Sequence, residues 1–549
     1  LASHMDAPYD GYLAFNEAWY SLAAENYDHF SWFEPHPYDN YLDLNVPPFF
    51  SYALNLSYAV FGGREWAFRL IPIATGLICV IMTFLIGRAL YGLRAGLAAA
   101  VLLAVCPVFV LTARNVQTDG MFLCLMLCGF HFYVQYLRNR NPGTMLFSAI
   151  MFGGALFTKQ VAIVAVAALA ISEFINNRYR IVNPKRLIYF LAVLVVIPGH
   201  FYLYHLIKNP GRLFSSTRFG ALNTAEIPDL VSAFTLLAEL FYGLGPALAI
   251  LGVLGLVSGL AARRRAHPLI TWSLVLYFLF FMIVHKHTYY MLPMAPFLCI
   301  LAGRLLSDMK IKAAGGIIIT IAAAAGLLQS LMVLGALKLG YNRFEPLCSH
   351  IRMTPGRKIL IVEDSIMNRF EPVLRFYCRD VPLHRQNEWQ DPHSPGLMPL
   401  QYGDVSYFFL MSQLAPQDTS SPYMHHYNKH ILGPVFFGRM FFYIPYEHNN
   451  RMRTFVPGKL DIRPVKHGSA FNMATAVVQH SLQMLELPPE FGVYKRAPRE
   501  RIHGEGPIYF FPLPPEPPAI EYEIKKKQQA AKKRSAQKHK PEQDQSIHR

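Results

Sequence analysis

The sequence predicts an α-helical protein that crosses a membrane many times. Of its 549 residues, 53% are hydrophobic and only 16% are charged, whereas soluble domains carry about a quarter charged residues. The mean hydropathy is positive, at +0.24. The apolar residues gather in repeated runs near the roughly 20 residues that a helix needs to cross a bilayer. These observations predict a polytopic membrane protein with about ten spans.

The apolar runs define an expected transmembrane domain over residues 67–337. Two of the runs are short and are expected to form a helical hairpin that turns at Thr158, Lys159 and Gln160. The runs cover residues 67–89, 95–113, 120–137, 144–157, 160–176, 187–207, 236–260, 268–285, 289–305 and 313–337.

Basic residues are distributed unevenly among the loops. One alternate set of five loops holds fourteen Lys and Arg residues, whereas the first loop of the opposite set, residues 6–66, carries nine acids and one Arg. Because short loops rich in Lys and Arg stay in the cytoplasm, residues 6–66 and everything after 338 are predicted to be extracytoplasmic. The polar turns at Asp119, Lys159 and 285–288 fall on that same face.

The first extracytoplasmic segment, residues 6–66, is too polar to span the membrane but is rich in aromatic residues. Segments 13–26 and 49–61 are expected to be interfacial amphipathic helices, with their rings at headgroup depth. Pro47 and Pro48 mark the start of the second helix.

The polar C-terminal part predicts a small extracytoplasmic α/β domain over residues 345–510. Its expected strands are Lys358–Val362, Val405–Met411 and Met440–Ile444, with a helix near 368–377. Cys348 and Cys378 are candidates for a disulfide in an oxidising compartment.

A Pro-rich linker and a basic tail follow over residues 511–549. Half of the net charge of +16 lies in Lys525–Lys540, which holds eight Lys or Arg and no acid. We interpret this run as a solvated, disordered tail, with adhesion to anionic lipid as the alternative, and not as a nucleic-acid site.

Acids and cations on the predicted outer face suit a lipid-linked phosphate donor whose tail stays in the bilayer. A general base is a carboxylate close to the nucleophile, and a leaving phosphate needs cations where its charge develops. Membrane carboxylates also serve ion-coupled transporters or lipid flippases, so that class remains the alternative; such proteins place them near the midplane and show internal repeats.

Six motifs occur in a fixed order along the chain. They are Asn16-Glu17-Ala18-Trp19-Tyr20, Val46-Pro47-Pro48, the segment 61–70, Thr118-Asp119-Gly120, Ala155-Leu156-Phe157-Thr158-Lys159 and Tyr289-Tyr290-Met291-Leu292-Pro293. This order resembles the membrane glycosyltransferases of the GT-C class, and most of all the protein O-mannosyltransferase and aminoarabinose-transferase family. The similarity extends over residues 6–306.

The resemblance implies transfer of a sugar from a polyprenyl-phosphate donor to an acceptor hydroxyl of a protein, lipid or glycan. It implies an extracytoplasmic reaction at the cell (inner) membrane, usually with inversion at the sugar. Members of the family have a membrane span just before the first acidic motif, so we expect one to precede this chain. The resemblance implies no cofactor; a divalent cation remains an open alternative and its ligands unknown.

The same resemblance assigns roles to residues. Glu17 is the expected base, helped by Asp119 or replaced by Asp10, because the family often has Asp-Glu where this chain has Asn16-Glu17. Several relatives place Lys or His just before the Pro-Pro, where this chain reads Asn45-Val46. The expected pocket for the donor phosphate is formed by Lys286, His285, His287, Lys159, Tyr290 and Arg69.

Each assignment has a structural alternative. Asp119 is also a suitable helix cap, Lys159 can extend to the interface from a helix end, and Arg69 can pair with Glu65 at i, i+4. Arg218, in the loop 215–220, is a hypothetical member of a substrate-gating loop.

Overall fold

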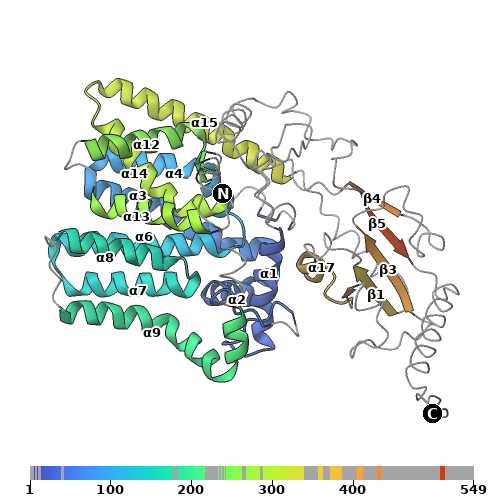
Figure 1. Ribbon diagram of the computed structural model, residues 1–549. Coiled ribbons are helices and arrows are strands. Elements are labelled where there is room, and N and C mark those ends of the chain that lie inside the picture. Colours follow the sequence, from blue (N-terminus) through green and yellow to red (C-terminus); the bar gives the residue numbers. More distant parts are fainter. Residues whose placement is uncertain are drawn as a thin grey trace, which may run out of the picture. The chain divides into compact units, whose positions relative to one another are not determined.

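The structure is a computed structural model of the chain (Figure 1). It describes residues 5–338 apart from 7–8, 10–13, 39–41, 177–183, most of 217–242, 262–266 and 285–287. Beyond these it describes 357–362, 371–381, 383–385, 405–411, 430–434 and 507–512.

Helices dominate the first part of the chain, and they run side by side as a bundle (Figure 1). Five of them are long and apolar enough to cross a membrane: 65–91, 118–139, 187–208, 289–307 and 312–331. The bundle helices are α3 (Glu65–Tyr91), α4 (Leu93–Ala104), α5 (Pro107–Thr112), α6 (Thr118–Asn139), α7 (Pro142–Thr158), α8 (Ala162–Asn176), α9 (Pro184–Lys208), α12 (Pro246–Ala261), α13 (Pro268–Ile283), α14 (Ala295–Ser307) and α15 (Lys312–Lys338).

The shorter helices α4, α7, α8, α12 and α13 coincide with the remaining apolar runs. The run predicted over 95–113 is divided in two, because Pro107 starts a new helix after the break at Val105 and Cys106. The hairpin predicted around Lys159 is present, since α7 ends at Thr158 and α8 begins at Ala162.

Two short helices lie at one end of the bundle: α1 (Ala14–Glu25) and α2 (Phe49–Phe61) (Figure 1). Their bounds confirm the helices expected at 13–26 and 49–61; their position at the membrane interface stays a prediction. Between them lie the 3-10 turn η1 (Asn26–Asp28) and a loop, and a second 3-10 segment, η2 (Thr288–Met294), precedes α14.

Small residues let the bundle helices approach closely. A Cβ atom on Gly303 of α14 would lie 2.4 Å from the Ala95 carbonyl oxygen of α4, and one on Gly255 of α12 would lie 2.5 Å from the Leu301 carbonyl oxygen. Such contacts are typical of membrane helices, which associate by packing of small residues. The α4–α14 and α12–α14 interfaces therefore require glycine at positions 303 and 255, because any side chain there would meet the facing backbone.

A buried ion pair attaches α1 to the bundle. The Glu17 carboxylate accepts hydrogen bonds from Arg69 of α3, from Nε at 3.1 Å and from Nη2 at 3.2 Å. Its Oε1 also accepts from the Val116 backbone amide at 3.2 Å. Arg69 in turn donates to the Met5 carbonyl oxygen at 2.9 Å and lies over the Tyr9 ring. Both charged side chains are 3% exposed.

The C-terminal segments form a separate unit with a five-stranded mixed sheet in the order β2-β1-β3-β5-β4. Its strands are β1 (Arg357–Val362), β2 (Leu383–Arg385), β3 (Val405–Met411), β4 (His430–Pro434) and β5 (Pro507–Pro512), and helix α17 (Glu371–Tyr377) connects β1 to β2. β1 is parallel to β2 and β3, whereas β5 is antiparallel to β3 and β4. The expected strands at 358–362 and 405–411 are present; Met440–Ile444 lies outside the described residues.

Replacing Gly303 by alanine is expected to lower the melting temperature of the purified protein, since the added methyl group meets a backbone oxygen that cannot move aside. Overpacking of this kind typically destabilises by about 1–3 kcal/mol. Gly316→Ala is the control, because a Cβ atom there has nothing within 4 Å. Equal melting temperatures for the two variants would contradict the close approach of α4 and α14.

Replacing Arg69 by methionine is expected to destabilise the protein by about 3–5 kcal/mol, because it leaves the Glu17 carboxylate buried without its cation. The double variant Glu17→Gln with Arg69→Met should recover much of this loss. Arg64→Met, five residues away at an exposed position, serves as the control. Melting curves in detergent test the claim, which fails if R69M and R64M melt alike.

Candidate functional site

A second ion pair lies near the first. Asp119 occupies the first turn of α6, and Lys159 follows the last residue of α7. The Lys159 Nζ atom donates to Asp119 Oδ1 at 2.7 Å. Because Val116, which binds Glu17, lies three residues before Asp119, the two pairs occupy the same end of the bundle.

Two tyrosines of η2 lie beside the Lys159 ammonium. Its Nζ atom is 5.2 Å from the ring centroid of Tyr290 and 5.8 Å from that of Tyr289. A cation over aromatic faces is attracted by the ring quadrupole. The Lys159 side chain is still 19% exposed, whereas that of Asp119 is 6% exposed. Lys159 is therefore held in place with part of its surface open.

Asp43 is a third buried carboxylate at this end. Its Oδ2 accepts a hydrogen bond from Trp19 Nε1 at 2.8 Å, and its Oδ1 accepts from the Asn45 amide at 2.9 Å. Burial raises the pKa of Asp43, and these hydrogen bonds lower it by less.

Tyr20 connects Asp43 to the Asp119 pair. Burial raises the pKa of the Tyr20 hydroxyl first, and the nearby Asp43, Asp119 and Tyr290 raise it further. A hydrogen bond with the Thr118 side chain lowers it in part. The side chains of α1, the loop before α2, α6 and η2 thus converge around one phenol.

The loop between α1 and α2 is held by further polar contacts. Asn55 of α2 donates to the Ala24 carbonyl oxygen at 2.8 Å. Tyr204 of α9 donates to Glu34 at 3.2 Å, and the ring of His205 bonds the Phe33 carbonyl oxygen at 2.6 Å. These contacts fix the segment that contains Asp43.

The structure brings together four of the residues predicted from the sequence: Glu17 with Arg69, and Asp119 with Lys159. Tyr290 lies beside these pairs, because its ring contacts the Lys159 ammonium. Arg69 pairs with Glu17, 52 positions away, a contact that the i, i+4 pattern does not indicate. Five predicted residues lie outside the described part of the chain, namely Asp10, Arg218, His285, Lys286 and His287.

Sequence reasoning assigned no role to Tyr20, Tyr289 or Asp43. Asp43 was visible only as one acid among several in an aromatic-rich segment, and its contact with Trp19 joins positions 24 residues apart. The described residues contain no group of three or more His, Cys, Asp or Glu side chains that could hold a metal ion.

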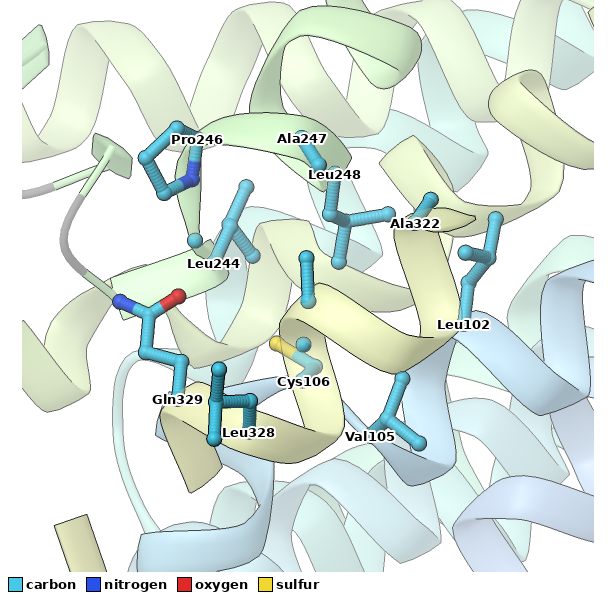
Figure 2. A pocket seen from close by; sticks show the side chains of 13 residues that line it. Leu102, Val105, Cys106, Leu244, Pro246, Ala247, Leu248, Ala322, Leu328 and Gln329 are labelled. Atoms are coloured by element: carbon cyan, nitrogen blue, oxygen red, sulfur yellow. The ribbon is translucent and has the colours of Figure 1, made fainter. Parts of the chain in front are cut away.

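Two cavities among the described residues are apolar and separate from this cluster. One of about 80 Å³ lies between the α4–α5 junction, the start of α12 and α15. Figure 2 shows its lining as aliphatic side chains together with Cys106 and Gln329. Another, of about 200 Å³, is lined by α6, α7, α8 and α9, with Glu173 bound to the Tyr133 hydroxyl. Neither includes Glu17, Asp43, Asp119 or Lys159.

Comparisons with known proteins point to one class. Residues 45–203 match the family model described as dolichyl-phosphate-mannose-protein mannosyltransferase. No curated protein matches the chain by sequence.

Solved structures share the fold. ArnT from Cupriavidus metallidurans bound to undecaprenyl phosphate is similar with a TM-score of 0.57 and 18% identity, over 78% of this chain and 93% of that chain. The archaeal oligosaccharyltransferase AglB from Archaeoglobus fulgidus, in complex with an inhibitory peptide and a dolichol-phosphate, is similar with a TM-score of 0.50 and 13% identity, over 74% of this chain and 66% of that chain.

The family match includes both Asp119 and Lys159, and the structural likeness to ArnT extends over most of the chain. The order of motifs in the sequence points to the same class. Together, the family match and the shared fold identify the chain as a membrane glycosyltransferase of the GT-C class.

Proposed function

We propose that the protein transfers a sugar from a polyprenyl-phosphate donor to an acceptor hydroxyl of a protein, lipid or glycan, with inversion at the sugar. The family description names a dolichyl-phosphate-linked sugar, and ArnT and AglB have been solved with undecaprenyl phosphate and with a dolichol-phosphate. These ligands share a phosphate on a long isoprenoid tail, which suits an enzyme whose active site lies at the end of a membrane bundle.

The observation on which this proposal rests is the Asp119–Lys159 pair beside Tyr289 and Tyr290. A lysine ammonium has three N–H donors, and one of them is used by Asp119. The other two N–H donors can bond to a phosphate oxygen, because part of the Lys159 side chain is exposed. Asp119 and the two rings hold the ammonium in place before the reaction, so it stabilises developing negative charge without reorganising.

The leaving group needs no acid in this scheme. When the bond between the anomeric carbon and the phosphate oxygen breaks, its electron pair stays on the polyprenyl phosphate, which departs as an anion. Lys159 compensates that charge, and the Tyr290 hydroxyl is proposed to donate to it. Lys286, His285 and His287 are proposed to complete the phosphate pocket, and Arg218 to belong to a loop that gates it.

Glu17 and Arg69 are proposed to position the site. Both oxygens of Glu17 already accept hydrogen bonds from Arg69, so the carboxylate is a poor candidate to take a proton from an acceptor. Because Arg69 donates to Glu17 in this pair, it is a poor candidate to bind the donor phosphate. Asp10 and Asp119 remain candidates for the base from the sequence, and Asp119 is paired with Lys159.

We place the reaction on the extracytoplasmic side. The distribution of Lys and Arg among the loops supports this orientation. In the C-terminal unit Cys378 is disulfide-bonded, which fits an oxidising compartment. By contrast, Cys79, Cys106, Cys124, Cys128 and Cys299 of the membrane helices are free. Cys348, the expected partner of Cys378, lies outside the described residues.

Replacing Lys159 by methionine is expected to reduce kcat at least 100-fold with a polyprenyl-phosphate sugar donor, because removing one preorganised donor to developing charge costs about 10²–10³ in rate. Lys159→Arg should retain more activity than Lys159→Met. The assay uses purified protein in detergent, a synthetic short-chain polyprenyl-phosphate sugar, and an acceptor fraction from membranes.

Lys208→Met is the matched control, since Lys208 also lies over a tyrosine ring, that of Tyr204 at 5.9 Å, but is exposed. Its activity should stay near that of the wild type. Equal activities of K159M and K208M would remove Lys159 from the mechanism. Failure of the wild type to transfer sugar from any such donor would favour a transporter or flippase instead.

A further inference from the structure

The buried acids around the site differ in their ion-pair and hydrogen-bond partners. Glu17 is bound by the Arg69 guanidinium and Asp119 by the Lys159 ammonium. These contacts occupy both oxygens of Glu17 and one oxygen of Asp119. At position 16 this chain has an asparagine, where the family that it resembles often has Asp. The asparagine amide takes up no proton at neutral pH. The contacts of Glu17 and Asp119 therefore favour another described carboxylate as the base.

Asp43 is held differently. Its hydrogen-bond donors, namely the Trp19 indole, the Asn45 backbone amide and the Asn45 side chain, are all neutral. A carboxylate has about four lone-pair sites, so these bonds leave it capacity to accept a proton. They also fix the orientation of the group. Asp43 is thus a buried, oriented carboxylate with capacity to accept a proton.

Asp43 also lies beside the phosphate end of the site. The Tyr20 hydroxyl is near Asp43, Asp119 and Tyr290 at once, and Lys159 bonds Asp119 and lies over Tyr290. A base for an inverting transfer has to stand across the sugar from the phosphate. Gln160, the neighbour of Lys159, donates to the Asn45 carbonyl oxygen at 2.8 Å, so the segment that carries Asp43 lies beside the turn that carries Lys159.

We infer that Asp43 is the general base that deprotonates the acceptor hydroxyl. The inference rests on the proposed function. The acceptor O–H proton passes to Asp43, the oxygen lone pair forms the bond to the anomeric carbon, and the bond from that carbon to the phosphate oxygen breaks. The electron pair of the broken bond leaves with the polyprenyl phosphate, whose charge Lys159 compensates.

The electrostatics of the pocket agree with this role. A base works best when its pKa lies nearer the working pH than that of an ordinary carboxyl, and burial shifts the pKa of Asp43 in that direction. Among the described residues, the titratable groups whose pKa values Asp43 raises are Tyr20 and Tyr27. Around Tyr20 are Asp119, which is paired with Lys159, and Tyr290. Lys159 thus bonds to Asp119, whereas the hydrogen-bond donors of Asp43 are the neutral groups of Trp19 and Asn45.

The decisive variant is Asp43→Asn, assayed with the same donor and acceptor as above. We expect kcat to fall by about 10²–10⁴-fold, the usual contribution of general base catalysis, while the dissociation constant of the donor changes less than threefold. Asp308→Asn is the matched control, because Asp308 is a carboxylate that follows α14, pairs with Arg304 and has a side chain that is 42% exposed. It should keep nearly wild-type kcat.

A pH profile separates a base from a merely structural group. A base has to be ionised, so wild-type kcat/KM should rise with pH through the pKa of Asp43, and D43N should lose that acid limb. Folding disfavours the ionised form of a carboxyl whose pKa is raised, so the wild type loses stability as pH rises above the ordinary carboxyl pKa of about 4. The asparagine removes that effect, and D43N should melt at or above the wild-type temperature at pH 7.

The inference is overturned if D43N keeps kcat within fivefold of the wild type or retains the acid limb. If D43N does not fold, Asp43→Glu decides: a displaced carboxylate should lower kcat at least fivefold with the acid limb retained, and unchanged kcat would overturn the inference. Transfer by the wild type together with unimpaired D43N removes Asp43 and leaves the proposed function standing. A wild type that transfers no sugar overturns both.

Discussion

The arrangement of the site depends on one buried ion pair, Glu17 with Arg69. Two charges at 3% exposure are stable only when each satisfies the other and the remaining hydrogen-bond groups are filled. Here Val116 and Met5 supply those extra bonds. The pair joins α1 to the start of α3 and to the segment just before α6. The pair therefore helps to keep α1, and with it Tyr20, close to Asp119.

Three carboxylates at this end of the bundle differ because their surroundings differ. Glu17 is bound by a guanidinium, Asp119 by an ammonium, and Asp43 by neutral N–H groups of Trp19 and Asn45. The same chemical group can therefore fix a loop, orient a cation or accept a proton. In the proposed reaction, this division assigns phosphate binding and deprotonation of the hydroxyl to separate side chains.

Local patterns in the sequence predicted much of the fold. The helices at 13–26 and 49–61 and most apolar runs were predictable because helix composition and proline positions are local signals. The break before Pro107 was missed, because the apolar run continues through it. Asp119 and Lys159 were each recognisable as candidate site residues from their motifs. The contact of Glu17 with Arg69 and that of Asp43 with Trp19 were not, since both depend on packing between segments far apart in the chain.

The most direct test of the account is a cryo-EM map of the protein with added polyprenyl phosphate. The account predicts phosphate density within hydrogen-bond distance of Lys159 Nζ, beside Tyr290, with the lipid tail passing between the helices into the membrane region. Phosphate density at another place, with the Asp119–Lys159 pair closed off from the lipid, would contradict it.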